Sequence, residues 1–279
     1  MRSLKIIRPL NCMMIALGSF CGMLLVKNIL EFGNLLVPII PALICSFLIG
    51  AGGNVLNDYY DRAVDSIIKP SRPLPRGELT AEQARALAIL LLSTGAFAGI
   101  LTFNCLAIII ALLAILLLAS YEKIFKRRGF SGNLIISALV AFVFLFGGAS
   151  VNVNLELNAL KPLIIMAILA FLSTLGREIV KDIEDMKGDR IERHTLPLKI
   201  GITKASVVGA CALITAIALS TLPYILKIFD WIYLVIILPA DVIFIYSISL
   251  FLKYPAKAST MIKLGMAIAL FGFIINSIL

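Results

Sequence analysis

The stretch NDYYDRAVD, residues 57–65, sets three aspartates at positions i, i+3 and i+7, and the stretch KDIEDMKGD, residues 181–189, repeats that spacing. In a helix of about 3.6 residues per turn, this spacing puts the three carboxylates of each stretch on one face. Like charges on one face destabilise a helix, but carboxylate oxygens bind hard divalent cations, and Mg²⁺ is commonly shared between carboxylates and substrate phosphates. Two such stretches, each ending an apolar run, predict a magnesium site more readily than a solvated acidic helix end.

The composition indicates a membrane protein. The chain has 279 residues, of which 61% are hydrophobic and 15% charged, and its mean hydropathy is +1.03. Soluble globular domains are about 45–50% apolar and 25% charged. The apolar runs are about 20 residues long, which is the length needed to cross a bilayer as a helix. The composition therefore excludes a soluble globular protein and predicts an all-α, polytopic membrane protein.

The hydropathy pattern predicts nine transmembrane helices in one bundle, forming a single domain over residues 1–279. Two loops of about 20 residues carry the Asp stretches, and structureless loops of that length are uncommon unless they are functional. We expect short helices and turns in them to form a cap over the cytoplasmic mouth. The predicted spans are 9–26, 35–57, 81–103, 105–120, 131–150, 160–181, 203–226, 231–251 and 258–278.

The basic residues predict the orientation. Of the 25 Lys and Arg residues, 22 lie at the N-terminus or around the loops after the even-numbered spans. By the positive-inside rule, the N-terminus and both Asp stretches face the cytoplasm of a protein in the cell membrane, and the C-terminus lies outside. The net charge of +9 is then explained by orientation and by anionic lipid or phosphate, so nucleic acid is not an expected partner.

An internal repeat relates the two Asp stretches. A shift of 124 residues lays the first triad of aspartates onto the second, and the same shift aligns Pro73 with Pro197 and Gly77 with Gly201. Residues 1–124 and 125–251 therefore read as two copies of a four-helix unit, followed by a ninth helix. Because equivalent elements of a repeat usually meet around a shared site, we expect the two Asp faces to look at each other across a cavity.

Basic and amide side chains near the Asp faces suggest an anionic substrate. Carboxylate-bound Mg²⁺ with Arg and Lys around one cavity would hold a diphosphate and stabilise the charge it gains on leaving. An apolar bundle suits a hydrocarbon tail, and a dry cavity would protect an allylic carbocation from water. Asn11 reaches either this cavity or a neighbouring helix. Beside the aspartates, the candidate residues are Asn11, Asn57, Arg72, Tyr121, Lys126, Arg127, Arg177 and Lys181.

These motifs resemble a known family. The first Asp stretch followed by RPLPRG, residues 72–77, is similar to the first signature of the UbiA superfamily of intramembrane prenyltransferases, and DIEDMKGD, residues 182–189, is similar to the second. The resemblance implies a nine-helix bundle, Mg²⁺ and an isoprenyl diphosphate donor. It implies roles around metal and diphosphate for Asn57, Asp58, Asp61, Asp182 and Asp185, with Lys126 in the catalytic set and Asp65 and Asp189 in support.

A narrower resemblance concerns the acceptor. The stretch GREIVKDIED, residues 176–185, with Thr195-Leu196-Pro197, is similar to the archaeal branch that makes ether lipids, the digeranylgeranylglyceryl phosphate synthases. That branch transfers a geranylgeranyl group to the hydroxyl of geranylgeranylglyceryl phosphate, and a lipid-phosphate acceptor suits the surplus of bases. Two alternatives stay open: an aromatic acceptor, as in quinone biosynthesis, and, from another class, a secondary transporter.

Overall fold

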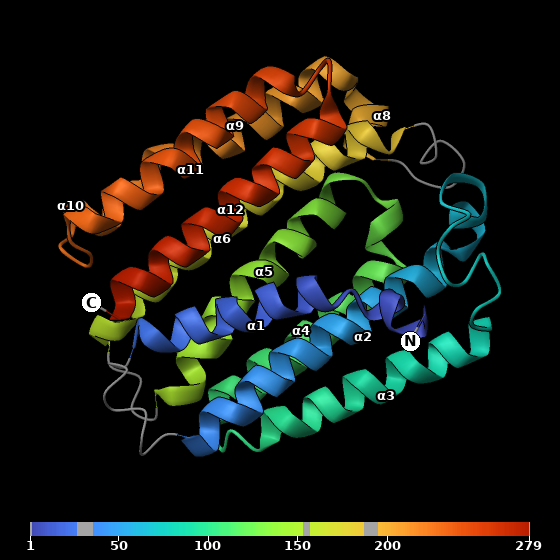
Figure 1. Ribbon diagram of the computed structural model, residues 1–279, viewed down its shortest axis with the longest axis horizontal. Coiled ribbons are helices and arrows are strands. Elements are labelled where there is room, and N and C mark those ends of the chain that lie inside the picture. Colours follow the sequence, from blue (N-terminus) through green and yellow to red (C-terminus); the bar gives the residue numbers. More distant parts are fainter. Residues whose placement is uncertain (1, 27–35, 153–156, 187–194, 279) are drawn as a thin grey trace.

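The computed structural model describes residues 2–26, 36–152, 157–186 and 195–278. Within these ranges the chain is helical and contains no strand. The helices run alongside one another in a single bundle (Figure 1). Their bounds are η1 Arg2–Ile7, α1 Pro9–Leu24, α2 Leu36–Ile68, α3 Ala81–Ile100, α4 Cys105–Lys123, η3 Phe125–Arg127, α5 Phe130–Val151, α6 Leu157–Glu184, α8 Leu196–Ile200, α9 Ile202–Ser220, α10 Leu222–Ile225, α11 Trp231–Leu250 and α12 Pro255–Ile278.

The predicted fold class is confirmed. In the described ranges, eight helices are long and apolar enough to cross a membrane, and α1 is a shorter apolar helix of 16 residues. At a rise of 1.5 Å per residue α1 is about 24 Å long, less than the roughly 30 Å of a hydrocarbon core. It packs against α2, α5 and α12, so protein rather than lipid surrounds much of it.

The end of the second helix differs from the prediction. The second span was expected to end at residue 57, but α2 continues to Ile68 and contains the whole first Asp stretch. Its 33 residues make about 50 Å of helix, so its polar end extends beyond an apolar layer of about 30 Å. Hydropathy cannot locate this end, because the helix continues where the polarity changes. The seventh predicted span, 203–226, agrees with the apolar segment Ile202–Ile225, in which the short α10 follows α9.

The expected cap is only partly helical. Short helices η1, η3 and α8 border the polar end of the bundle, whereas residues 69–80 form turns. Pro70, Pro73 and Pro75 explain the turns, since proline lacks an N–H and restricts the residue before it. Part of the second loop, residues 187–194, lies outside the described residues.

The arrangement brings the Asp-bearing ends of α2 and α6 to one end of the bundle. In Figure 1, α2 and α3 lie on one side, α9 and α11 on the other, and α1 and α5 between them. The labelled N- and C-termini lie at opposite ends (Figure 1). α2 packs on α3 as α6 packs on α9, which are the elements that the 124-residue shift relates. The division into 1–124 and 125–251 stays a prediction.

Glycines allow α1 and α5 to touch backbone to backbone. A Cβ placed on Gly147 would lie 1.9 Å from the carbonyl oxygen of Ser19, and one on Gly22 would lie 2.2 Å from the carbonyl oxygen of Phe144. Small residues at such crossings are the usual basis of close helix packing in membranes. This contact fixes α1, whose N-terminal end carries polar residues of the site described below.

We expect Gly147→Ala to destabilise the bundle, because the added methyl group meets backbone that cannot rotate away. Overpacking of this kind costs about 2 kcal/mol, or a fall of about 5 °C in the thermal midpoint. The measurement is thermal unfolding in detergent. Gly209→Ala is the matched control, since its Cβ would meet its nearest neighbour at 3.4 Å and alanine favours a helix. Equal midpoints for the two variants would contradict this account of the α1–α5 contact.

Candidate functional site

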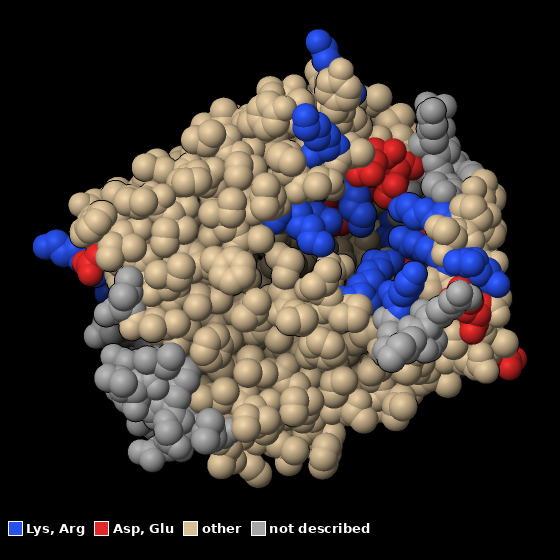
Figure 2. Space-filling model, in the orientation of Figure 1, with Lys and Arg blue, Asp and Glu red and all other residues tan. Residues whose placement is uncertain are grey.

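Charged side chains gather around one hollow of the surface. Figure 2 shows one face of the molecule, with a depression near its middle. Lys and Arg side chains lie beside the depression and toward the end of the bundle that holds the Asp stretches. Elsewhere on this face, charged side chains appear mainly at its edges, such as the top and the left (Figure 2). Most of the charge on this face therefore gathers at one mouth of an otherwise apolar bundle.

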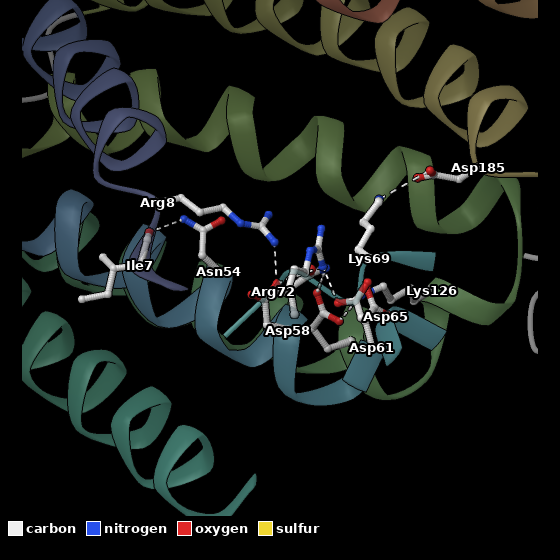
Figure 3. Close-up of polar contacts among 12 residues, drawn as sticks. Ile7, Arg8, Asn54, Asp58, Asp61, Asp65, Lys69, Arg72, Lys126 and Asp185 are labelled. Atoms are coloured by element: carbon white, nitrogen blue, oxygen red, sulfur yellow. Dashed lines mark hydrogen bonds and ion pairs between the residues drawn. The ribbon is translucent and has the colours of Figure 1, made fainter. Parts of the chain in front are cut away.

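The aspartates of α2 are held by two arginines. Asp58 and Asp65 are buried, with 3% and 4% of their surface exposed. Arg72, in the turns after α2, forms an ion pair with Asp65 and lies 3.2 Å from Asp58 Oδ1. Arg8, which precedes α1, forms a second ion pair with Asp58 (Figure 3). Buried carboxylates need such partners, because an uncompensated charge away from water is costly.

Arg8 reaches Asp58 through an unusual backbone conformation. Its φ of 54° and ψ of 67° lie in the left-handed region, which costs a non-glycine residue on the order of 1–2 kcal/mol. Asn54 of α2 helps to hold this turn, because its amide nitrogen donates to the carbonyl oxygen of Ile7 at 2.8 Å (Figure 3). Strained residues that the surroundings hold in place are frequent at functional sites.

A second ionic group surrounds Asp61. Lys126, which follows α4, lies 2.9 Å from Asp61 Oδ2 and 2.7 Å from Glu122 Oε2. Asn57 donates to the other oxygen of Glu122 at 3.0 Å. The Lys126 ammonium also lies 5.8 Å from the ring centroid of Tyr121, within cation–π range. Four of the predicted residues thus form one connected group that joins α2 to the end of α4.

The second Asp stretch faces the first across the mouth. Asn133 of α5 donates to Asp182 Oδ2 at 2.9 Å. Lys69, one turn beyond Asp65, lies 3.5 Å from Asp185 Oδ1, so a lysine side chain spans the gap between the two stretches (Figure 3). Asp189 lies outside the described residues.

A third ionic group lies on α6, within the five residues before Asp182. The buried Glu178 accepts from Arg177 at 2.6 Å and lies 3.6 Å from Lys181. With one carboxylate for two cations, this group carries a net positive charge. Its members line the cavity, as described next.

Behind the mouth lies a cavity with two lobes. The first lobe, about 300 Å³, is bordered by Arg8, Asn57, Tyr121, Glu122, Glu178 and Lys181. The second lobe, about 290 Å³, is bordered by Met14, Ser173, Ser220, Asp241, Lys263 and Phe273. Both lobes share Asn11, Ile15, Asn54, Val140, Val143 and Arg177. The lobes therefore meet beside α1, with polar groups at the junction and apolar walls beyond it.

The structure brings most predicted residues to this mouth or cavity. Arg127 lies in η3, beside the Lys126 group. Asp241, an acid within α11, accepts from Ser220 at 2.7 Å and borders the second lobe. The predicted site residues did not include Arg8, Asn54, Lys69, Glu122, Asn133 and Lys263. Glu122 had a signal, since it stands four residues before Lys126, whereas the others contact residues far away in the chain.

The acidic residues suit Mg²⁺ by their chemistry. Carboxylate and amide oxygens are its preferred ligands, and it is usually held by one or two carboxylates together with waters and substrate phosphates. Within the described ranges, no three His, Cys, Asp or Glu side chains lie close enough together to hold a metal ion. The arrangement therefore fits ions that each take no more than two of these carboxylates and share a phosphate-bearing substrate.

Comparison with known proteins agrees with this geometry. Residues 15–272 match the UbiA prenyltransferase family. The digeranylgeranylglyceryl phosphate synthase of Methanocaldococcus jannaschii is 39% identical over 284 residues, covering 99% of this chain and 95% of that protein. That of Methanopyrus kandleri is 36% identical, covering 97% of each chain.

Solved structures share the fold. A structure of a digeranylgeranylglyceryl phosphate synthase has a TM-score of 0.75 and 37% identity, covering 99% of this chain and 97% of that one. A UbiA homologue from Archaeoglobus fulgidus, bound to GPP and Mg²⁺, has a TM-score of 0.63 at 18% identity, covering 96% of this chain and 99% of that one. The match along nearly the whole chain shows that this multi-pass membrane protein belongs to the UbiA prenyltransferase family.

Proposed function

We propose that this protein transfers the geranylgeranyl group of geranylgeranyl diphosphate to the free hydroxyl of geranylgeranylglyceryl phosphate. The bond between C1 of the donor and its diphosphate oxygen breaks, the bond from C1 to the acceptor oxygen forms, and the hydroxyl proton leaves. The product is an archaeal ether lipid, digeranylgeranylglyceryl phosphate. Relatives with that activity in their names match 97–99% of this chain at 36–39% identity.

The observation that carries the proposal is the meeting of two Asp-bearing helix ends at the mouth of an apolar cavity. Lys69, directly after α2, lies 3.5 Å from Asp185 at the end of α6, so the polar ends of the two helices meet. A substrate with an anionic head and a long tail fits a charged mouth that opens into apolar lobes. A transporter with alternating access would instead hold its substrate near the bilayer midplane, whereas these carboxylates lie at helix ends.

The basic residues at the mouth would bind the diphosphate. Arg8, Arg72 and Lys126 already balance the buried aspartates of α2, and Arg177 and Lys181 border the first lobe from α6. Such preorganised cations stabilise the negative charge that develops on the leaving group. Their existing partners hold the side chains in place before the substrate arrives.

Magnesium would be bound by Asp58 and Asp61 from α2 and by Asp182 and Asp185 from α6, with Asp65 and Asp189 in support. The metal supplies charge neutralisation for the departing diphosphate. Asn57 supplies an amide that orients Glu122 beside this group. The departing diphosphate or a carboxylate accepts the proton of the acceptor hydroxyl.

The apolar walls protect the reacting carbon. An allylic carbocation reacts with water, so the chemistry needs a cavity from which water is excluded. The first lobe supplies Ile49, Ile110, Leu118, Val143 and Phe146 around the polar groups. These walls also accommodate a hydrocarbon tail, whose transfer from water contributes roughly 0.8 kcal/mol per buried CH₂.

The mouth faces the cytoplasm in our proposal, with the N-terminus on the same side and the C-terminus outside. The sequence bias of 22 of the 25 basic residues toward the N-terminus and the loops after the even-numbered spans supports this orientation by the positive-inside rule. Soluble geranylgeranyl diphosphate would then reach the charged groups directly.

The reaction is tested by an acceptor panel with the purified protein. With geranylgeranyl diphosphate and geranylgeranylglyceryl phosphate, mass spectrometry should find digeranylgeranylglyceryl phosphate and one diphosphate per product. Hydroxybenzoate and naphthoate acceptors should give at least about 100-fold less product, because they lack the lipid phosphate and glycerol hydroxyl that this site would bind. Comparable prenylation of an aromatic acceptor, or flux into liposomes without turnover, would contradict the proposal.

The carboxylates are tested one from each stretch. Asp58→Asn and Asp182→Asn should each lower kcat about 100-fold or more, because each removes a metal ligand next to the leaving group. EDTA should abolish diphosphate release, and Mg²⁺ should restore it. Asp230→Asn, an exposed aspartate at the start of α11, is the matched control and should keep wild-type kcat. Full activity in either site variant would exclude the proposed metal site.

The orientation is tested with terminal tags in inside-out membrane vesicles. Protease should remove an N-terminal tag and spare a C-terminal tag, because an odd number of crossings places the two ends on opposite sides. Detergent should make both tags accessible, which controls for the cleavage itself. Protection of the N-terminal tag would reverse the assignment.

A further inference from the structure

Lys263 occupies a position that a role in setting the membrane orientation of the chain does not explain. It lies eight residues after the start of α12, about 12 Å along the helix, and it borders the second lobe. A lysine at such depth is costly in lipid, and long basic side chains usually extend toward the interface instead. Here the ammonium donates to the amide oxygen of Asn11 at 2.8 Å, across the cavity on α1. The charge is therefore held on the cavity side of α12, where Lys263 stays exposed.

The surroundings of Lys263 carry positive charge. It lies close enough to Arg177 and Arg8 for their charges to repel its own. Arg177 is paired with Glu178 and Arg8 with Asp58. Among the described residues Lys263 forms no ion pair, since Asn11 is neutral. A cation held beside two others, without an acid of its own, leaves room for an anionic ligand.

Donors at the junction of the lobes are available for such a ligand. The Nε of Arg177 is buried and has no hydrogen-bond partner within the described part of the chain. Leaving a buried donor unsatisfied costs about 1–3 kcal/mol. Asn11 accepts from Lys263 through its oxygen, so the two hydrogens of its amide nitrogen can serve another acceptor. Lys263, Arg177 and Asn11 all border the second lobe.

We propose that Lys263, Arg177 and Asn11 bind the phosphate of the acceptor lipid, whose tail occupies the second lobe. The proposal rests on the proposed function and assigns the two lobes to the two substrates. Ammonium and guanidinium groups form strong charge-assisted hydrogen bonds with phosphate.

The geometry of α1 agrees with two neighbouring anion sites. Arg8 borders the first lobe and pairs with Asp58 of the diphosphate mouth, whereas Asn11, three residues later, borders both lobes. Arg8 directly precedes α1, and Asn11 lies in its first turn. An acceptor phosphate at Asn11 would therefore lie about one helical turn from the donor site. In the acceptor, the phosphate and the reacting hydroxyl are on adjacent carbons, so this spacing lets the hydroxyl approach C1 of the donor.

The experiment measures how each substrate depends on Lys263. Lys263→Met keeps much of the side-chain length but removes the charge. At saturating donor, it should raise KM for geranylgeranylglyceryl phosphate about tenfold or more, the effect of losing a hydrogen bond to a charged group. KM for geranylgeranyl diphosphate should stay within about twofold of wild type. Lys263→Arg should retain most of the affinity for the acceptor. Lys257→Met, which alters an exposed lysine on the same helix, should match wild type.

A second acceptor makes the test independent of how well a variant folds. Wild-type protein should use geranylgeranylglycerol, which lacks the phosphate, about tenfold or more less efficiently than the phosphorylated acceptor, and Lys263→Met should lose this preference. Three results would each overturn the inference. Wild-type protein could use both acceptors equally well, or Lys263→Met could keep the preference for the phosphorylated acceptor. Lys263→Met could also raise KM for the donor instead of the acceptor. In all three cases transfer still occurs, whereas failure of the proposed function would show as no transfer to geranylgeranylglyceryl phosphate by wild-type protein.

Discussion

Burial of carboxylates at the ends of apolar helices is the constraint on which this structure depends. Asp58 and Asp65 are almost inaccessible, and such charges persist only with partners. Their partners come from segments far apart in the chain, Arg8 before α1 and Arg72 after α2, and Lys126 after α4 pairs with the neighbouring Asp61. The ion pairs therefore do more than balance charge, because they tie the N-terminal segment and two loops to α2. The position of the mouth follows from this requirement.

The apolar remainder of the bundle obeys a different rule. Lipid gives no hydrophobic force between helices, so close approach and local hydrogen bonds decide the packing. Gly22 and Gly147 let α1 meet α5 at backbone distance. With α1 held there, its first turn carries Asn11 to the junction of the two lobes, and Arg8 just before it borders the first lobe. Packing in the apolar layer thus determines where the polar groups of the mouth can lie.

Sequence patterns predicted the number of apolar helices and the helical face of the first Asp stretch, because length and period are local properties. They did not predict that α2 continues to Ile68, since the change to polar residues marks the apolar boundary and not the helix end. They also assigned Lys263 to the bases that set orientation. An apolar helix such as α12 has no polar face that reveals its rotation, so only tertiary packing turns Lys263 toward Asn11. The partner of Asp58 was missed for a related reason, since Arg8 reaches it through one left-handed residue.

The pairing of the acids also explains how three aspartates can share a helical face. Alone, their repulsion would destabilise the end of α2. Each cation that neutralises an aspartate can also donate hydrogen bonds to phosphate, because phosphate and carboxylate are both anionic oxygen acceptors. In the proposed reaction, Arg72 and Lys126 would turn part of their hydrogen bonding toward the diphosphate without leaving the site. The carboxylates so released would be free to bind a cation, which the negative charge of the substrate also favours. Under this proposal, binding of the anion and binding of the cation would be coupled through the same side chains.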